Sequence, residues 1–103
     1  MGIDVRWETE TGGELEVIWD EQDILSSLVD SGTGDAGAIC LRFLDAWGDT
    51  VFNQNQLPVL AVELAALETH LEDPDEAAHV ARVLGLVQRA NGEQHTYVRF
   101  SGD

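Results

Sequence analysis

The sequence predicts an α+β domain with a mainly antiparallel sheet and helices packed on one face of it. Near both ends of the chain, polar and apolar residues alternate, which is typical of strands with one buried face. Between residues 57 and 90, apolar residues recur at the three- and four-residue spacing of helices. The predicted order of elements is β-β-α-β-β-α-α-β.

The first two strands are predicted to form a hairpin around a glycine-rich turn at residues 11–13. The residues expected on its buried face are Ile3, Val5 and Trp7 before the turn, and Leu15, Val17 and Trp19 after it. Acidic residues at its start and apolar residues at helical spacing then predict a short helix over residues 20–30. The glycines and small residues of 31–37 indicate a connecting loop.

A second hairpin is predicted from residues 38–44 and 50–52. The first segment is almost continuously apolar apart from Arg42, as in a central strand, and residues 45–49 have the chemistry of a turn. The last strand is expected at residues 95–100. Its two faces would carry Thr96, Val98 and Phe100 on one side and His95, Tyr97 and Arg99 on the other.

Two helices are predicted between these strands. The first, over residues 57–71, has one stripe formed by Leu57, Leu60, Leu64, Leu67 and Leu71 and a second formed by Val59, Val62 and Ala66. A helix apolar on so much of its circumference must be covered on two sides. The second stripe therefore needs either the next helix or another copy of the chain, and the latter predicts a homodimer through this helix.

The next helix has clear signals at both of its ends. Asp73 can cap it, Pro74 suits its first turn, and Asn91 with Gly92 can end it in a left-handed conformation. Its apolar stripe contains Val80, Val83, Leu84 and Val87. The helix is therefore expected to run from residue 74 to about residue 90.

Length and composition indicate one domain over residues 1–103, because two cores in so short a chain would each be too small. The single cysteine, Cys40, forms no intramolecular disulfide and favours a reducing compartment. The first ten residues lack the pattern of a signal peptide, and no apolar run is long enough to span a membrane. The expected location is therefore cytoplasmic, without membrane association.

Charge is the most unusual property of the chain. Twenty acidic residues face five arginines, lysine is absent, and the formal net charge is −15. Direct binding to nucleic acid is disfavoured, because phosphate contacts require clustered cations. A basic protein partner is favoured instead, although such charge also serves solubility alone. Residues 1–35 hold ten carboxylates and one arginine, which makes them the expected docking face.

Eight residues are candidates for a ligand or partner site. The polar stretch after the apolar segment offers two carboxylates and an amide that could hold a cation or a small ligand, and the open face of the last strand could complete the site. The candidates are Arg42, Asp45, Trp47, Asp49, Asn53, His95, Tyr97 and Arg99. The alternatives are turn construction for the polar stretch and cross-strand ion pairing with Glu8, Glu14 or Glu16 for the strand.

No catalytic residues, metal ligands or cofactors are predicted. The serines lack the context of an activated nucleophile, and Cys40 in an apolar segment is expected to be a buried hydrophobe. His70 and His79 are expected at exposed helical positions, and no two histidines have the spacing of a local metal motif. The sequence therefore predicts that the protein is not an enzyme.

Three blocks resemble a family of short, stand-alone bacterial proteins of uncharacterised function. They are CLRFLD at residues 40–45, GDTVFN at residues 48–53 before a leucine-rich helix, and HTYVRFSGD at residues 95–103. Together with the leucine-rich helix, the blocks cover about a third of the chain. The resemblance implies a bacterial, single-domain protein and no particular mechanism.

The leading functional hypothesis is a non-catalytic interaction protein, either an immunity or inhibitor type or an accessory subunit, that docks a basic partner. A domain that binds a small ligand or metal through the candidate residues above is the first alternative. A DNA-mimic inhibitor, whose carboxylates take the place of phosphates, is the second. The sequence supplies the charge for this last function but not the spacing.

Overall fold

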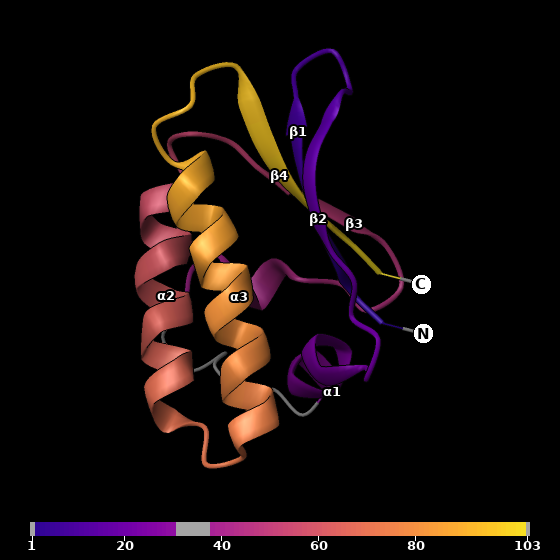
Figure 1. Cartoon of the computed structure of the whole chain (residues 1–103), viewed down its shortest axis with the longest axis vertical. Helices are drawn as coiled ribbons and strands as arrows, with labels where there is room; N and C mark the ends of the chain where they lie inside the picture. The colour runs from indigo at the N-terminus through magenta and orange to yellow at the C-terminus, as the bar shows by residue number, and fades with distance from the viewer. Residues whose placement is uncertain (1, 31–37, 103) are drawn as a thin grey trace.

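The computed structural model describes residues 2–30 and 38–102, so the loop predicted at 31–37 lies outside the described residues. The described residues form a four-stranded antiparallel sheet in the order β2-β1-β4-β3, with helices on one face, which confirms the predicted α+β class (Figure 1). The strands are β1 (Asp4–Thr9), β2 (Glu14–Ile18), β3 (Asp49–Phe52) and β4 (Thr96–Ser101). The helices are α1 (Ile24–Asp30), α2 (Leu57–His70) and α3 (Pro74–Ala90), with a 3-10 turn, η1 (Leu41–Phe43).

The core lies between the sheet and the helices α2 and α3. Phe52 and Phe100 pack edge to face with ring centroids 5.6 Å apart, and Val98 beside them is fully buried. The leucine stripe of α2 meets this core through Leu57, Leu60, Leu64 and Leu67. Burial of each such side chain stabilises the fold by roughly 1.5–3 kcal/mol.

The first hairpin forms as predicted, but the buried face of its second strand is the opposite one. Val5 pairs with Ile18 and Arg6 pairs with Val17, so Ile18 faces the core and Val17 faces the open side. The register shifts near Leu15, which is 51% exposed, as is Trp19. One extra residue in a strand, as in a β-bulge, moves the following side chains to the opposite face of the sheet. The alternation of polar and apolar residues does not reveal such a shift.

The strand predicted at residues 38–44 is wrong. Three consecutive backbone amides, those of Ile39, Cys40 and Leu41, donate to the carboxylate of Glu63 on α2, and the chain then turns through η1. A strand would direct successive amides to opposite sides, so this convergence prevents strand pairing. The predicted second hairpin is absent from the described residues, and β3 pairs with β4 instead.

The helix predicted at residues 20–30 begins four residues later, at Ile24, because Asp20 is used as a buried anchor. Its carboxylate accepts hydrogen bonds from the amides of Ile3, Leu25 and Ser26 at 2.9–3.1 Å. One side chain thereby joins the start of the sheet to the first turn of α1. Only the tertiary contact with residue 3 shows that residue 20 lies outside the helix.

The ends of α3 are as predicted. Asp73 accepts from the amides of Asp75 and Glu76, Pro74 occupies the first turn, and Gly92 takes a φ of +120° after the helix. No helix among residues 2–30 and 38–102 is long and apolar enough to cross a membrane. The stripe Val59, Val62 and Ala66, here called the outer face of α2, stays exposed, so α3 does not cover it.

Candidate functional site

The open face of the sheet carries an ion-pair network centred on Arg99. Its guanidinium lies 2.9 Å from Glu8 on β1 and 3.1 Å from Asp49 on β3, so it links three strands. The hydrogen bond that Arg99 donates to Glu8 is the main cause of a raised pKa for Arg99. Tyr97 stands opposite Glu8 on this same face. The cross-strand pairing expected with Glu8 is therefore present.

His95 lies away from that network. It precedes β4 with a φ of +64°, its side chain is exposed, and its Nδ1 is 3.2 Å from Glu10. Asp49 pairs with Ser101 at the other end of β4. Six residues of extended strand separate these two positions by roughly 20 Å. The structure therefore does not bring His95 and Asp49 into one shared site.

The polar stretch after η1 is used to build turns. The Asp45 carboxylate accepts from the Trp47 amide at 2.8 Å, and the Asn53 side chain accepts from the amides of Asn55 and Gln56. Trp47 itself is 70% exposed. No group of three or more potential metal ligands occurs within the part of the chain that the structure describes.

Arg42 occupies η1, with its guanidinium 5.2 Å from the ring centroid of Phe43. It is therefore not on a strand beside His95, as the sequence suggested. The neighbouring Cys40 is buried, as expected, and burial raises the pKa of its thiol, with Glu63 adding to the effect. A thiol in such surroundings stays protonated at neutral pH and is a poor nucleophile.

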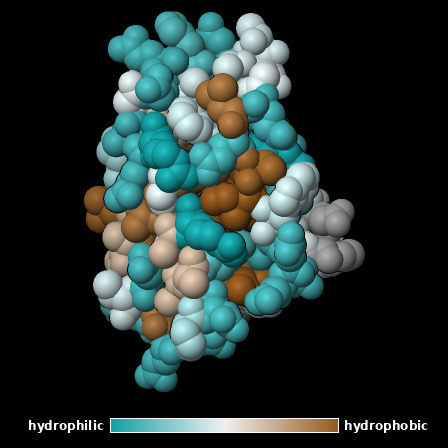
Figure 2. All heavy atoms as spheres, in the orientation of Figure 1, coloured by the Kyte–Doolittle hydropathy of each residue, from teal (hydrophilic) through white to brown (hydrophobic). Residues whose placement is uncertain are grey.

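A cleft of about 650 Å³ lies between the end of β2, the start of α1 and the N-terminal half of α3. In Figure 2 apolar side chains gather in a hollow between α3 and β2, with hydrophilic atoms around them. The residues that line the cleft are Val17, Ile18, Trp19, Glu21, Gln22, Ile24, Asp75, Ala78, His79 and Arg82. None of them carries a hydroxyl or a thiol.

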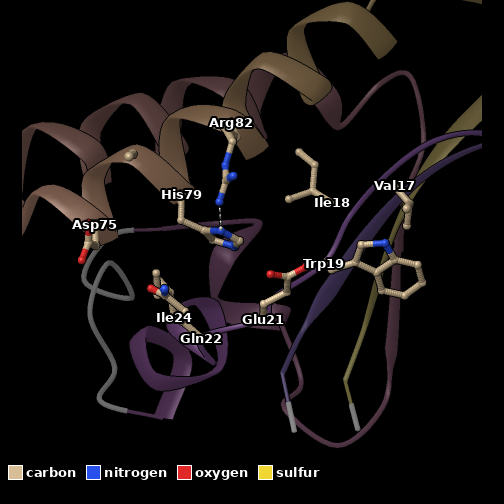
Figure 3. Close-up of a pocket in the computed structure, with 10 residues that line it drawn as sticks. Val17, Ile18, Trp19, Glu21, Gln22, Ile24, Asp75, His79 and Arg82 are labelled. Carbon is tan, nitrogen blue, oxygen red and sulfur yellow. Dashed lines mark hydrogen bonds between the residues drawn. The ribbon is translucent and has the colours of Figure 1, made fainter.

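His79 projects from α3 into the middle of the cleft lining (Figure 3). The sequence placed it on an exposed position, and this is wrong, because His79 is only 2% exposed. The Arg82 guanidinium lies 3.1 Å from its Nδ1. Arginine only donates, so Nδ1 accepts and the proton is on Nε2.

The other ring nitrogen faces the buried Asp20. Nε2 of His79 lies 3.4 Å from Oδ1 of Asp20 but makes no well-directed hydrogen bond among the described residues. Burial is the main cause of a lowered pKa for His79; Asp20 opposes this shift and Arg82 adds to it. The imidazole is thus neutral at pH 7 and holds Arg82 in place at the cleft.

The carboxylates divide into a paired and an unpaired group. Three arginines neutralise the first hairpin and its neighbours, through the pairs Arg6 with Glu14, Arg89 with Glu16, and Arg99 with Glu8 and Asp49. Asp20 is also engaged, as described above. Much of the acidity of the N-terminal third is therefore satisfied within the molecule.

A group of neighbouring carboxylates without ion pairs among the described residues lies where α2 turns into α3. This corner, here called the acidic corner, is formed by Glu68, Glu72, Asp73, Asp75 and Glu76. Asp73 caps α3, and the other four side chains have no ion pair with any described residue. The corner adjoins the cleft, because Asp75 belongs to both.

The cleft has only a weak signal in the sequence. Trp19 follows β2 and His79 lies within the polar part of α3, but neither pattern indicates that the two line one cavity. A histidine three residues before an arginine on a helix does predict contact between them. Comparisons of the chain with protein-family models, with curated proteins and with solved structures find no match.

Proposed function

We propose that this protein is a non-catalytic interaction protein that docks a basic partner through the acidic corner. The observation that carries the proposal is the unpaired state of Glu68, Glu72, Asp75 and Glu76 among the described residues, while the carboxylates of the sheet are largely paired. No internal ion pair has to be broken before these carboxylates contact a partner. It is therefore the part of the surface most available to a cation.

The magnitude of the charge supports the same function. A net charge of −15 on a chain of 103 residues speeds encounter with a basic protein and repels acidic ones. It also disfavours contact with nucleic acid phosphates. Attraction of this kind weakens with salt, because exposed charges are screened over roughly 8–10 Å at physiological ionic strength.

The test compares two triple variants that each remove three negative charges. Glu68→Gln/Glu72→Gln/Glu76→Gln changes the acidic corner, and Glu10→Gln/Glu14→Gln/Glu93→Gln changes the opposite end of the molecule. Basic proteins captured by the wild-type chain at low salt should be released by salt, retained by the second variant and lost by the first. Equal capture by both variants, or capture of acidic proteins only, contradicts the proposal.

The same experiment separates the alternative functions. A DNA mimic would capture DNA-binding proteins, and free duplex DNA would release them. The ligand site proposed from residues 45–55 and the last strand would need its parts together, whereas His95 and Asp49 stand at opposite ends of β4. The acidic corner therefore has the stronger geometric support.

A further inference from the structure

The lining of the cleft combines apolar side chains with exposed carboxylates. Ile18, Ile24 and Ala78 contribute apolar surface, and Trp19 is half-exposed at one end. Glu21 and Asp75 add two exposed carboxylates. Half-buried isoleucines beside two exposed carboxylates match a long side chain with an apolar stem and a cationic head.

The carboxylates of the lining are not neutralised from inside the cleft. Arg82 is the basic residue of the lining, but it is committed to His79, and no ion pair joins it to Glu21 or Asp75. In Figure 3 Arg82 lies on one side of His79, and Glu21 lies on the other with Ile24 and Gln22. Positive and negative groups are thus segregated, and the cation of a ligand is directed away from Arg82.

We propose that this cleft receives an arginine or lysine side chain of the basic partner, with the stem on Ile18 and Ile24 and the head between Glu21 and Asp75. The inference rests on the proposed function, since it names the element that the partner inserts beside the acidic corner. Charge complementarity selects this occupant, because the cleft lies in a molecule of net charge −15.

In the experiment, the full chain is titrated with a short peptide that alternates leucine and arginine. Binding is measured by NMR from the changes in the amide chemical shifts of the chain. The control peptide carries citrulline in place of each arginine, which keeps the shape and removes the charge. We expect shifts at Trp19, Gln22 and Ala78, and binding about tenfold weaker for the citrulline peptide.

Variants of the chain locate the cation. Glu21→Gln, which changes the cleft but not the acidic corner, should weaken binding of the arginine peptide several-fold, whereas the matched variant Glu93→Gln should not. Arg82→Gln keeps a hydrogen-bond donor for His79 and removes a positive charge that repels the arginine peptide. The peptide should therefore bind this variant more tightly. Weaker binding of the arginine peptide by Arg82→Gln would show that Arg82 does not repel the bound group and would overturn the inference.

The outcome also distinguishes this inference from the proposed function. If the peptide shifts only residues 68–76, and the corner variant alone abolishes its binding, the cleft is not the site and docking through the acidic corner stands. If the cleft binds the peptide but the corner variant still captures basic proteins, the inference stands and the proposed role of the corner fails. Equal binding of arginine and citrulline peptides would overturn the cationic occupant.

Discussion

The protonation of His79 is governed by its burial and by two side chains from different parts of the chain. Its own helix supplies Arg82 on one ring nitrogen, and Asp20, from the segment before α1, lies beside the other. The ring is surrounded by core atoms on α3 and is almost without exposed surface. Burial and the neighbouring Arg82 disfavour the protonated form of this ring, and the carboxylate of Asp20 favours it.

We predict that stability decreases below pH 6.5 in a way that depends on His79. Its pKa is lowered in the folded chain from an ordinary value of 6.5, so the unfolded chain binds the proton first. The stabilisation from neutral His79 is complete above pH 6.5 and is lost as the pH falls towards the folded pKa. Urea unfolding of wild type and His79→Gln between pH 7.5 and 5 measures this.

The free energy of unfolding should fall more steeply for wild type than for His79→Gln over that range. Curves that stay parallel would contradict the assignment of a lowered pKa. A wild-type curve that falls less steeply than that of His79→Gln would show that the attraction of Asp20 outweighs burial. Titration of the His79 ring proton by NMR gives the direction independently.

At the scale of elements, the space around two glycines shows how tightly their surroundings pack. At the end of β4, Gly102 donates to the carbonyl of Gly48 and lies against the turn at Asp45 and Ala46. On α3, Gly85 sits in the interior of a helix where a Cβ would meet only the end of the flexible Arg89 side chain, at 3.2 Å. The backbone therefore leaves no room for a side chain at Gly102, whereas at Gly85 it does.

We predict opposite effects for the two glycine-to-alanine substitutions. Gly102→Ala should destabilise by about 1–3 kcal/mol, because its Cβ would overlap backbone atoms of Asp45 and Ala46. Gly85→Ala should stabilise by about 0.5–1 kcal/mol, because alanine has the higher helix propensity. Thermal and urea unfolding of both variants measure the change. A destabilising Gly85→Ala would mean that Arg89 cannot move aside without weakening its ion pair with Glu16.

At the scale of the whole molecule, the outer face of α2 exposes apolar side chains. Val62 is 70% exposed and Val59 is 38% exposed. The segment that Glu63 holds against α2 adds Ile39, which is 63% exposed. Exposed apolar side chains gathered in one region are typical of interaction surfaces. No element among the described residues covers the stripe of Val59, Val62 and Ala66, although its apolar character predicts that it packs against a neighbour.

We predict a homodimer through the outer face of α2, formed most readily at high salt, where the repulsion between two acidic chains is screened. Val62→Glu should convert it to a monomer, because the charge would be buried in the interface. Gln88→Glu adds the same charge at an exposed position of α3 and should leave the dimer intact. Sedimentation at high protein concentration measures both. A wild-type monomer under those conditions rules the dimer out.

The sequence predicted the elements whose signals are local. The cap at Asp73, the proline at residue 74 and the glycine at residue 92 are confirmed as the ends of α3, because capping depends on residues a few positions apart. The alternation of Thr96, Val98 and Phe100 gave the buried face of β4. The α+β class followed from such periodic segments, each of which must bury one face.

The tertiary structure decided the features that depend on partners far apart in the chain. Glu63 converts an apolar segment that resembles a strand into η1, and an irregularity near Leu15 exchanges the faces of β2. Asp20 and His79 are separated by 59 positions and meet only because α3 crosses the end of β2. Residue spacing specifies local geometry, whereas burial, ion pairing and the cleft depend on how the elements pack. The acidic composition was therefore readable from the sequence, and the location of its unpaired part was not.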